Sequence, residues 1–201
     1  MTAPARRRGR PGYDLESLLG VAVEVFNERG YDGTSIQDLS RRLGIAKSAI
    51  YHHVQSKEQL LQLALDRALG GLGAVVARAR ALDGTAMARL ELLVHGSVEV
   101  LERELPYVTL LLRVRGNTEV ERSALERRRQ FDRYAASLVR QAERDGDIRP
   151  DIDPAVTARL LFGMVNSVAE WYRPGHGGAD VASALSAIAF DGLRASSAKR
   201  T

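Results

Sequence analysis

The chain contains no cysteine among its 201 residues. Disulfide bonds and cysteine-ligated zinc sites are therefore excluded, and the composition fits a reducing compartment. No segment approaches the roughly 18 consecutive apolar residues of a membrane span, and no apolar stretch follows the basic N-terminus as a secretory signal requires. We therefore expect a cytoplasmic protein without a membrane partner.

The sequence also lacks the signs of a β-protein or of a common enzyme. No alternating apolar pattern or hairpin dipeptide indicates a strand. No zinc-protease, serine-hydrolase or phosphate-loop pattern occurs, and the four histidines are scattered. We expect no catalytic residue, no metal and no cofactor; an unrecognised small-molecule enzyme stays open as an alternative.

Positive charge is concentrated near the N-terminus. The formal net charge is +4, of which residues 1–57 carry +3. Residues 1–12 are rich in arginine, proline and glycine, which predicts a disordered basic arm containing Arg6, Arg7, Arg8 and Arg10. An electropositive N-terminal part suits a polyanionic partner. The alternative for the arm is a solubilising tail.

Apolar residues recur at helical spacing through the rest of the chain, which predicts an all-α fold. The first helix is expected over about residues 14–28. Thr34 and Gln37 predict a capping box that starts a second helix, and Gly44 predicts a left-handed turn after it. A third helix should then cover about residues 46–54.

Ser56 and Gln59 predict a second capping box and a fourth helix. Three glycines fall within that helix, each costing about 1 kcal/mol relative to alanine, and we expect them to kink or break it: Gly70, Gly71 and Gly73. Further helices are expected at about residues 85–104, 106–115, 118–144, 154–173 and 179–195. Asp153 and Pro154 give the clearest of these start signals.

The predicted third helix has two different faces. Its polar face contains Lys47, Ser48, Tyr51 and His52, and its apolar face contains Ala46, Ile50 and Val54. The apolar face can pack on the first two helices, so that the polar face points outward with groups suited to base edges and phosphates. The alternative is the solvated surface of a plain three-helix unit.

Phosphate contacts are expected beside this helix. Thr34 and Ser35 lie at a predicted helix N-terminus, where free amides and the helix dipole favour an anion. Lys57 lies in the first turn of the fourth helix, where a cation opposes the dipole. A phosphate partner would explain a cation at that position.

The region 13–65 closely resembles the TetR family of bacterial transcriptional regulators. The matching residues are Phe26, Gly30, Tyr31, Thr34 to Ile36, Leu39, Gly44 to His53 and Ser56 to Leu60. The resemblance implies an all-α homodimer with an N-terminal helix-turn-helix domain and a larger C-terminal domain for effector binding and dimerisation. We place these domains at residues 13–57 and 58–201.

The resemblance also implies roles for single residues. The residues that it places in the major groove are Lys47, Ser48, Ala49, Tyr51 and His52. The residues that it expects to bind phosphates are Thr34, Ser35, Tyr51 and Lys57. The arm would reach the adjacent minor groove, as basic arms do elsewhere.

For the C-terminal domain, two apolar stripes near the end of the chain suit a dimer interface, which the family forms with its last two helices. The expected interface residues are Val168, Trp171, Val181, Leu185 and Ile188. The alternative is that they form the core of one subunit.

Aromatic and polar residues on the middle helices are candidates for an effector pocket: Tyr107, Leu111, Phe131, Tyr134, Phe162 and Asn166. Residues 171–175 are similar to a closing motif of family members that sense acyl-coenzyme A thioesters or regulate lipid and aromatic-acid breakdown; the alternative is that they only end a helix beside the dimer interface. Arg113 and Arg115 would suit an anionic effector, with solvated arginines at a helix end as the alternative. A cationic effector would have only Glu99 and Glu170.

These expectations together describe a ligand-responsive repressor. It would bind a pseudo-palindromic operator in double-stranded DNA as a homodimer, and a small apolar or acyl-coenzyme A-like effector would release it. The alternative is a constitutive DNA-binding protein without a ligand.

Overall fold

The computed structural model describes residues 14–173 and 180–194, which form two compact units divided between Leu63 and Ala64. The predicted basic arm lies outside the described residues. Those residues are helical apart from turns, loops and an isolated bridge between Ile148 and Arg194, which confirms the all-α fold class.

The N-terminal unit contains three helices and the start of a fourth, at α1 (Leu15–Arg29), α2 (Ile36–Leu43), α3 (Lys47–Tyr51) and α4 (Lys57–Ala81). The core of this unit is formed by apolar side chains that are almost fully buried, including Leu18, Phe26, Leu39, Ile50 and Leu60. The sequence therefore predicted these helices correctly, although α3 is shorter than expected.

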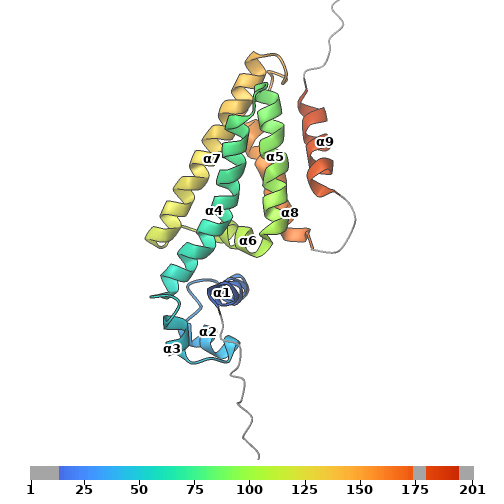
Figure 1. Cartoon of the computed structure of the whole chain (residues 1–201). Helices are drawn as coiled ribbons and strands as arrows, with labels where there is room; N and C mark the ends of the chain where they lie inside the picture. The colour runs from blue at the N-terminus through green and yellow to red at the C-terminus, as the bar shows by residue number, and fades with distance from the viewer. Residues whose placement is uncertain (1–13, 174–179, 195–201) are drawn as a thin grey trace, which may run out of the picture. The chain divides into compact units, whose positions relative to one another are not determined.

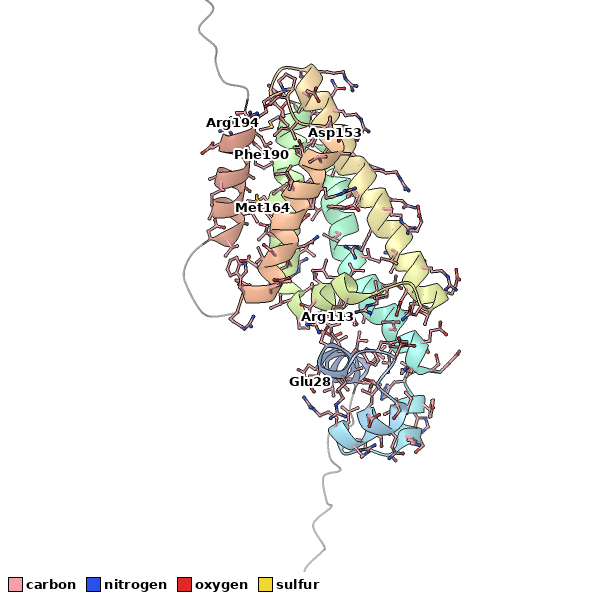
Figure 2. All side chains as sticks on the ribbon, turned by 180° about the vertical axis from the view of Figure 1, so that it is seen from behind. Glu28, Arg113, Asp153, Met164, Phe190 and Arg194 are labelled. Carbon is pink, nitrogen blue, oxygen red and sulfur yellow. The ribbon has the colours of Figure 1, made fainter. Side chains whose placement is uncertain are left out.

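The C-terminal unit contains the remainder of α4 and five further helices, at α5 (Ala86–Arg103), α6 (Leu105–Arg113), α7 (Glu119–Arg144), α8 (Pro154–Trp171) and α9 (Val181–Leu193). Within this unit α5 packs against α7, α8 and α9, and the short α6 lies across one end (Figure 1). As predicted, the carboxylate of Asp153 caps α8, accepting from the amides of Ala155 and Val156 (Figure 2).

The glycines of α4 do not interrupt it, so the expected break is wrong. Gly71 faces α5, where an added Cβ would lie 2.8 Å from Val100 Cγ1. Reciprocally, a Cβ on Gly96 of α5 would lie 2.8 Å from Val75 Cγ1. A valine of the facing helix thus packs against each glycine. This close packing offsets the low helix propensity of Gly71.

By length and composition α4 could cross a membrane, with a mean hydropathy of 1.4 over its most apolar window. Its contacts are those of a core helix. Asp66 pairs with Arg127 of α7, and Arg67 Nε donates to Glu104 Oε2 at 2.6 Å. The apolar side chains of Leu65, Ala68 and Leu69 are buried beside these ion pairs.

The packing of Gly71 predicts opposite effects for two alanine substitutions on one helix. Gly71→Ala should lower the free energy of unfolding by about 1–3 kcal/mol, because the new methyl group overlaps Val100. Gly70→Ala is the matched control: its Cβ meets nothing within 4 Å, so stability should rise by about 0.5–1 kcal/mol. Urea unfolding followed by circular dichroism measures both, and equal effects would contradict the assigned contact.

Candidate nucleic-acid interface and effector cavity

The turn between α2 and α3 is held by backbone hydrogen bonds. Gly44 adopts the left-handed conformation with φ of 66°, as predicted, and its N–H donates to the carbonyls of Ser40 and Arg41. The hydroxyl of Ser40 donates to the Ile45 carbonyl at 2.6 Å. An L-residue with a Cβ would be strained at Gly44, so this position favours glycine.

The turn leaves one face of α3 in contact with solvent. Ile50 and Val54 are buried, whereas the polar residues expected to face outward are all exposed, namely Lys47, Ser48, Tyr51 and His52. The Tyr51 side chain keeps 51% of its surface accessible, which is unusual for an aromatic residue. Ala46 was expected on the buried face but is exposed, because it precedes the helix as its N-cap.

The cations of the N-terminal unit differ in their partners. Arg42 Nη2 lies 2.8 Å from Glu28 Oε1, and Arg41 Nη2 lies 3.0 Å from Asp38 Oδ1. Among the described residues, no carboxylate lies within ion-pair distance of Lys47. Lys47 therefore presents an uncompensated charge on the exposed face of α3.

The start of α2 differs from the prediction. The capping box is formed by Ser35 and Asp38, one residue later than Thr34 and Gln37. Hydrogen bonds from Ser35 are the main cause that lowers the pKa of Asp38. Thr34 is only 2% exposed, and its hydroxyl donates to the Gly30 carbonyl at 2.8 Å. The hydroxyl of Thr34 is thus occupied inside the unit, which removes the basis for its expected phosphate contact.

Lys57 is also held within the unit. Its Nζ donates to the carbonyls of Tyr31 at 2.9 Å and Thr34 at 2.8 Å, and it lies 4.0 Å from the centroid of the Tyr31 ring. These contacts explain a cation in the first turn of α4 without a phosphate. The helix dipole therefore no longer argues for a phosphate at Lys57, and the expected phosphate contact stays a prediction, for which one N–H of the ammonium is available.

The start of α4 agrees in part with the second predicted capping box. Ser56 Oγ accepts from the Gln59 amide at 3.1 Å, as expected. The Gln59 side chain accepts from the amide of Gln55 rather than from that of Ser56.

In the C-terminal unit, four of the six expected effector residues line one cavity, which we call the central cavity: Leu111, Phe131, Phe162 and Asn166. Its volume is about 50 Å³, and the rings of Phe131 and Phe162 meet edge to face inside it at 4.9 Å. The other two residues do not line this cavity, although Tyr134 lines a separate groove between α4 and α7. Tyr107 is buried under the guanidinium of Arg67, and Arg80 lies over the ring of Tyr134.

Sequence reasoning missed other residues of the central cavity, among them Arg128 and Asp132 of α7. Desolvation raises the pKa of Asp132, while Arg128, Arg159 and Arg133 oppose the shift. Phe131 was expected to line the pocket. Its charged neighbours in the sequence, Arg128 three residues before it and Asp132 one residue after it, could therefore have been predicted to line the pocket as well.

A larger groove lies between α6 and α8 and has a volume of about 810 Å³; we call it the α6/α8 groove. Two cations line it, Arg113 at the end of α6 and Arg173 after α8, together with Glu170. Figure 2 shows Arg113 at the end of α6. Leu112 and Asn166 line both this groove and the central cavity, so the two spaces are neighbours.

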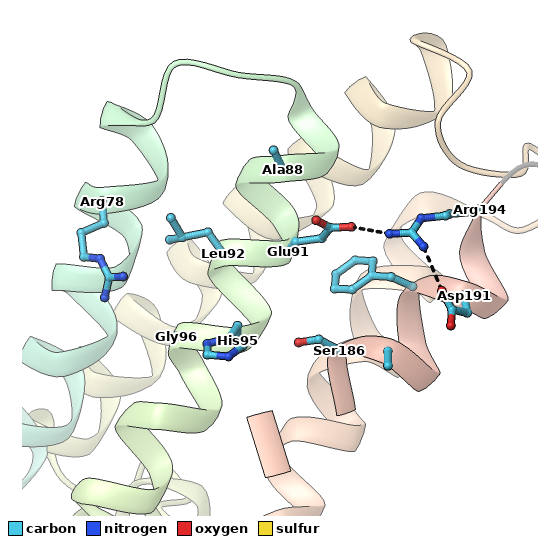
Figure 3. A pocket seen from close by; sticks show the side chains of 11 residues that line it. Arg78, Ala88, Glu91, Leu92, His95, Gly96, Ser186, Asp191 and Arg194 are labelled. Carbon is cyan, nitrogen blue, oxygen red and sulfur yellow. Dashed lines mark hydrogen bonds and ion pairs between the residues drawn. The ribbon is translucent and has the colours of Figure 1, made fainter. Parts of the chain in front are cut away.

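A third groove, of about 430 Å³, is lined by residues of α4, α5 and α9 (Figure 3). Its charges are balanced. Arg194 donates to Glu91 at 3.2 Å and to Asp191 at 2.9 Å, as the dashed lines in Figure 3 show. This balance favours no class of charged ligand.

The expected dimer-interface residues fall into two groups. Trp171 and Ile188 are exposed, Ile188 to 74%, and Val181 is partly exposed. Val168 and Leu185 are buried within their own subunit, so for them the alternative of a core role is correct. Val156 and Leu160 extend the exposed apolar face along α8.

Comparison with known proteins agrees with this architecture. Residues 18–64 match the family described as bacterial regulatory proteins, tetR family, and residues 83–193 match a tetracyclin repressor-like C-terminal domain. The chain is 31% identical to the HTH-type transcriptional repressor KstR2 of Rhodococcus jostii (strain RHA1) over 194 residues, which cover 92% of this chain and 93% of KstR2.

Two solved structures extend the comparison. SCO3833, a member of the TetR transcriptional regulator family from Streptomyces coelicolor A3, has a TM-score of 0.84 at 53% identity, covering 91% of this chain and 94% of its own. AibR, crystallised in complex with isovaleryl coenzyme A and operator DNA, has a TM-score of 0.74 at 25% identity, covering 87% and 97%.

The helix-turn-helix unit and these matches define a DNA-binding transcriptional regulator, not an enzyme. More specifically, the chain belongs to the TetR family.

The contacts of Lys57 predict a structural role that Lys47 lacks. Lys57→Met should lower the free energy of unfolding by about 1–3 kcal/mol, because two carbonyls lose a charged donor. Lys47→Met, the matched control on an exposed site, should stay within about 0.5 kcal/mol of the parent. Denaturant unfolding with hydrogen exchange at residues 31–35 measures the difference. If the two variants proved equally stable, the internal role of Lys57 would be refuted.

Proposed function

We propose that this protein is a ligand-responsive repressor that binds a pseudo-palindromic operator as a homodimer. The observation that carries the proposal is the exposed polar face of α3, with Lys47 uncompensated and Tyr51 half-accessible. Two such helices, held about one DNA turn (~34 Å) apart, would read two half-sites in the major groove.

Within this proposal, residues 13–57 read DNA and residues 58–201 bind the effector and the second subunit. The residues placed in the major groove are Lys47, Ser48, Ala49, Tyr51 and His52. Ser35, at the start of α2, would bind a phosphate through the helix N-terminus. The basic arm of residues 1–12 would enter the neighbouring minor groove.

Lys47 and Tyr51 provide the test of DNA reading. Lys47→Ala should weaken operator binding and change the preferred sequence, because a donor to base edges in the major groove is lost. Tyr51→Ala should change the preferred sequence as well as the affinity. Arg133→Ala, which removes a cation that pairs with Glu126, is the control and should alter neither quantity. Fluorescence anisotropy with the operator and with variants of its half-sites measures both, and an unchanged sequence preference for Lys47→Ala would contradict the assigned contact.

The second copy would cover the exposed apolar face formed by Val156, Leu160, Trp171 and Ile188 on α8 and α9. An apolar face of this kind favours burial against a partner, and the family match supports a copy of the same chain.

Ile188→Glu should therefore yield a monomer that binds the operator poorly, because the charge would be buried in the interface. Ser123→Glu adds the same charge to an exposed position on α7 and should leave the dimer intact. Sedimentation velocity gives the oligomeric state. A dimeric Ile188→Glu variant would show that another surface joins the subunits.

The effector is proposed to be a small apolar compound or an acyl-coenzyme A thioester. Support comes from the apolar central cavity beside a groove with two arginines, and from the complex of AibR with isovaleryl coenzyme A. The acyl group would enter the central cavity, and the anionic coenzyme A part would lie near Arg113 and Arg173. Release of the operator by isovaleryl coenzyme A tests this class, and a ligand-independent complex would favour a constitutive DNA-binding protein.

A further inference from the structure

A fourth space of the C-terminal unit adjoins the central cavity on another side. It lies between α4 and α7, has a volume of about 260 Å³, and we call it the α4/α7 groove. Leu72 and Phe131 line both this groove and the central cavity. These two residues thus lie between the α4/α7 groove and the central cavity, just as Leu112 and Asn166 lie between that cavity and the α6/α8 groove.

The central cavity is too small to hold an effector alone. Its volume of about 50 Å³ is far below the roughly 300 Å³ at which ligand pockets begin. Phe131 is only partly buried, so a turn of its ring away from Phe162 would join the central cavity to the α4/α7 groove. A ligand that fills the central cavity therefore gains room by extending past Phe131.

The far groove differs chemically from the central cavity. Apolar side chains such as Leu101, Val108 and Leu111 line most of the central cavity, and the charges of Arg128 and Asp132 in its lining oppose each other. In the α4/α7 groove, the Arg80 guanidinium lies 4.9 Å from the centroid of the Tyr134 ring.

Among the described residues, no carboxylate lies within ion-pair distance of Arg80, whereas its neighbour in the groove, Arg127, pairs with Asp66. The groove thus offers one oriented cation without an internal counter-charge.

We propose that the α4/α7 groove is the distal subsite of the effector site, and that it takes the far end of an extended effector whose apolar middle crosses the central cavity. That far end carries a carboxylate or another hydrogen-bond acceptor, which pairs with Arg80. The preferred effector is then apolar in the middle and polar at both ends. This inference rests on the proposed effector-binding function.

Two glycines of α4 allow the subsite to be blocked with a matched control. Gly73 lines the α4/α7 groove, and a Cβ added there meets nothing within 4 Å, so a leucine would project into the groove without a backbone clash. Gly70 also has open space around its Cβ position and lines none of the three spaces. Gly73→Leu and Gly70→Leu are therefore matched in helix and in residue type.

The experiment measures dissociation constants of the full chain for isovaleryl, decanoyl and sebacyl coenzyme A by isothermal titration calorimetry. Sebacyl coenzyme A is decanoyl coenzyme A with a carboxylate at the far end of its chain. The parent should bind the sebacyl thioester about tenfold more tightly than the decanoyl one, and Arg80→Gln should abolish this preference.

Gly73→Leu should weaken binding of both long thioesters by tenfold or more and leave isovaleryl coenzyme A unchanged, while Gly70→Leu should change none of the three. Circular dichroism melting curves verify that each variant is folded. Long-chain binding that survives Gly73→Leu would overturn the subsite. If the parent binds isovaleryl coenzyme A alone, the distal subsite is wrong and the proposed effector class stands; if it binds none of the three, both fail.

Discussion

The burial of Ile50 and Val54 is the constraint on which the DNA-reading surface depends. α3 is too short to be stable alone, so its orientation is imposed by packing against α2 and by the turn at Gly44. Once these two apolar side chains enter the core, the helical period places Lys47, Ser48 and Tyr51 on the opposite side. The exposed polar face therefore follows from the packing of the core.

A second constraint acts in the C-terminal unit, where α4 and α5 approach closely. Val100 packs against Gly71, and Val75 packs against Gly96. These two contacts set the register between the helices. The next residues along, Leu72 on α4 and Ser97 on α5, line the central cavity. A ligand that enlarges this cavity must press on the same pair of helices. α4 is continuous from Lys57 to Ala81. Under the proposed function, a displacement of α4 beside the central cavity would therefore be transmitted along this helix towards Lys57.

Much of the fold was predictable because its signals are local. Apolar periodicity located the helices, and Asp153 with Pro154 and Gly44 located ends that depend only on nearby backbone groups. What failed needed information from distant residues. Neither the fit of Val100 against Gly71 nor the two carbonyls that bind Lys57 can be read from the sequence around these residues. The capping box is an exception: it shifted by one residue because the Thr34 hydroxyl binds the Gly30 carbonyl, only four residues away.

In the candidate site, too, local sequence signals allowed correct predictions, and features set by tertiary contacts did not. The exposed face of α3 was predictable from spacing alone, whereas the cavity was predictable only in part. Residue type identified Leu111, Phe131, Phe162 and Asn166, but it did not separate them from Tyr107, which is buried under Arg67, or from Tyr134, which lines the neighbouring α4/α7 groove. Likewise Val168 and Ile188 are both apolar positions on terminal helices, yet one is buried and the other exposed.

The central claim, that the exposed face of α3 reads a specific DNA sequence, is tested most directly by selection of bound fragments from a random duplex library, using the full chain. The account predicts enrichment of one pseudo-palindrome whose half-sites lie about one helical turn apart. Recovery of unrelated sequences with no shared motif, at an affinity equal to that for bulk DNA, would contradict it.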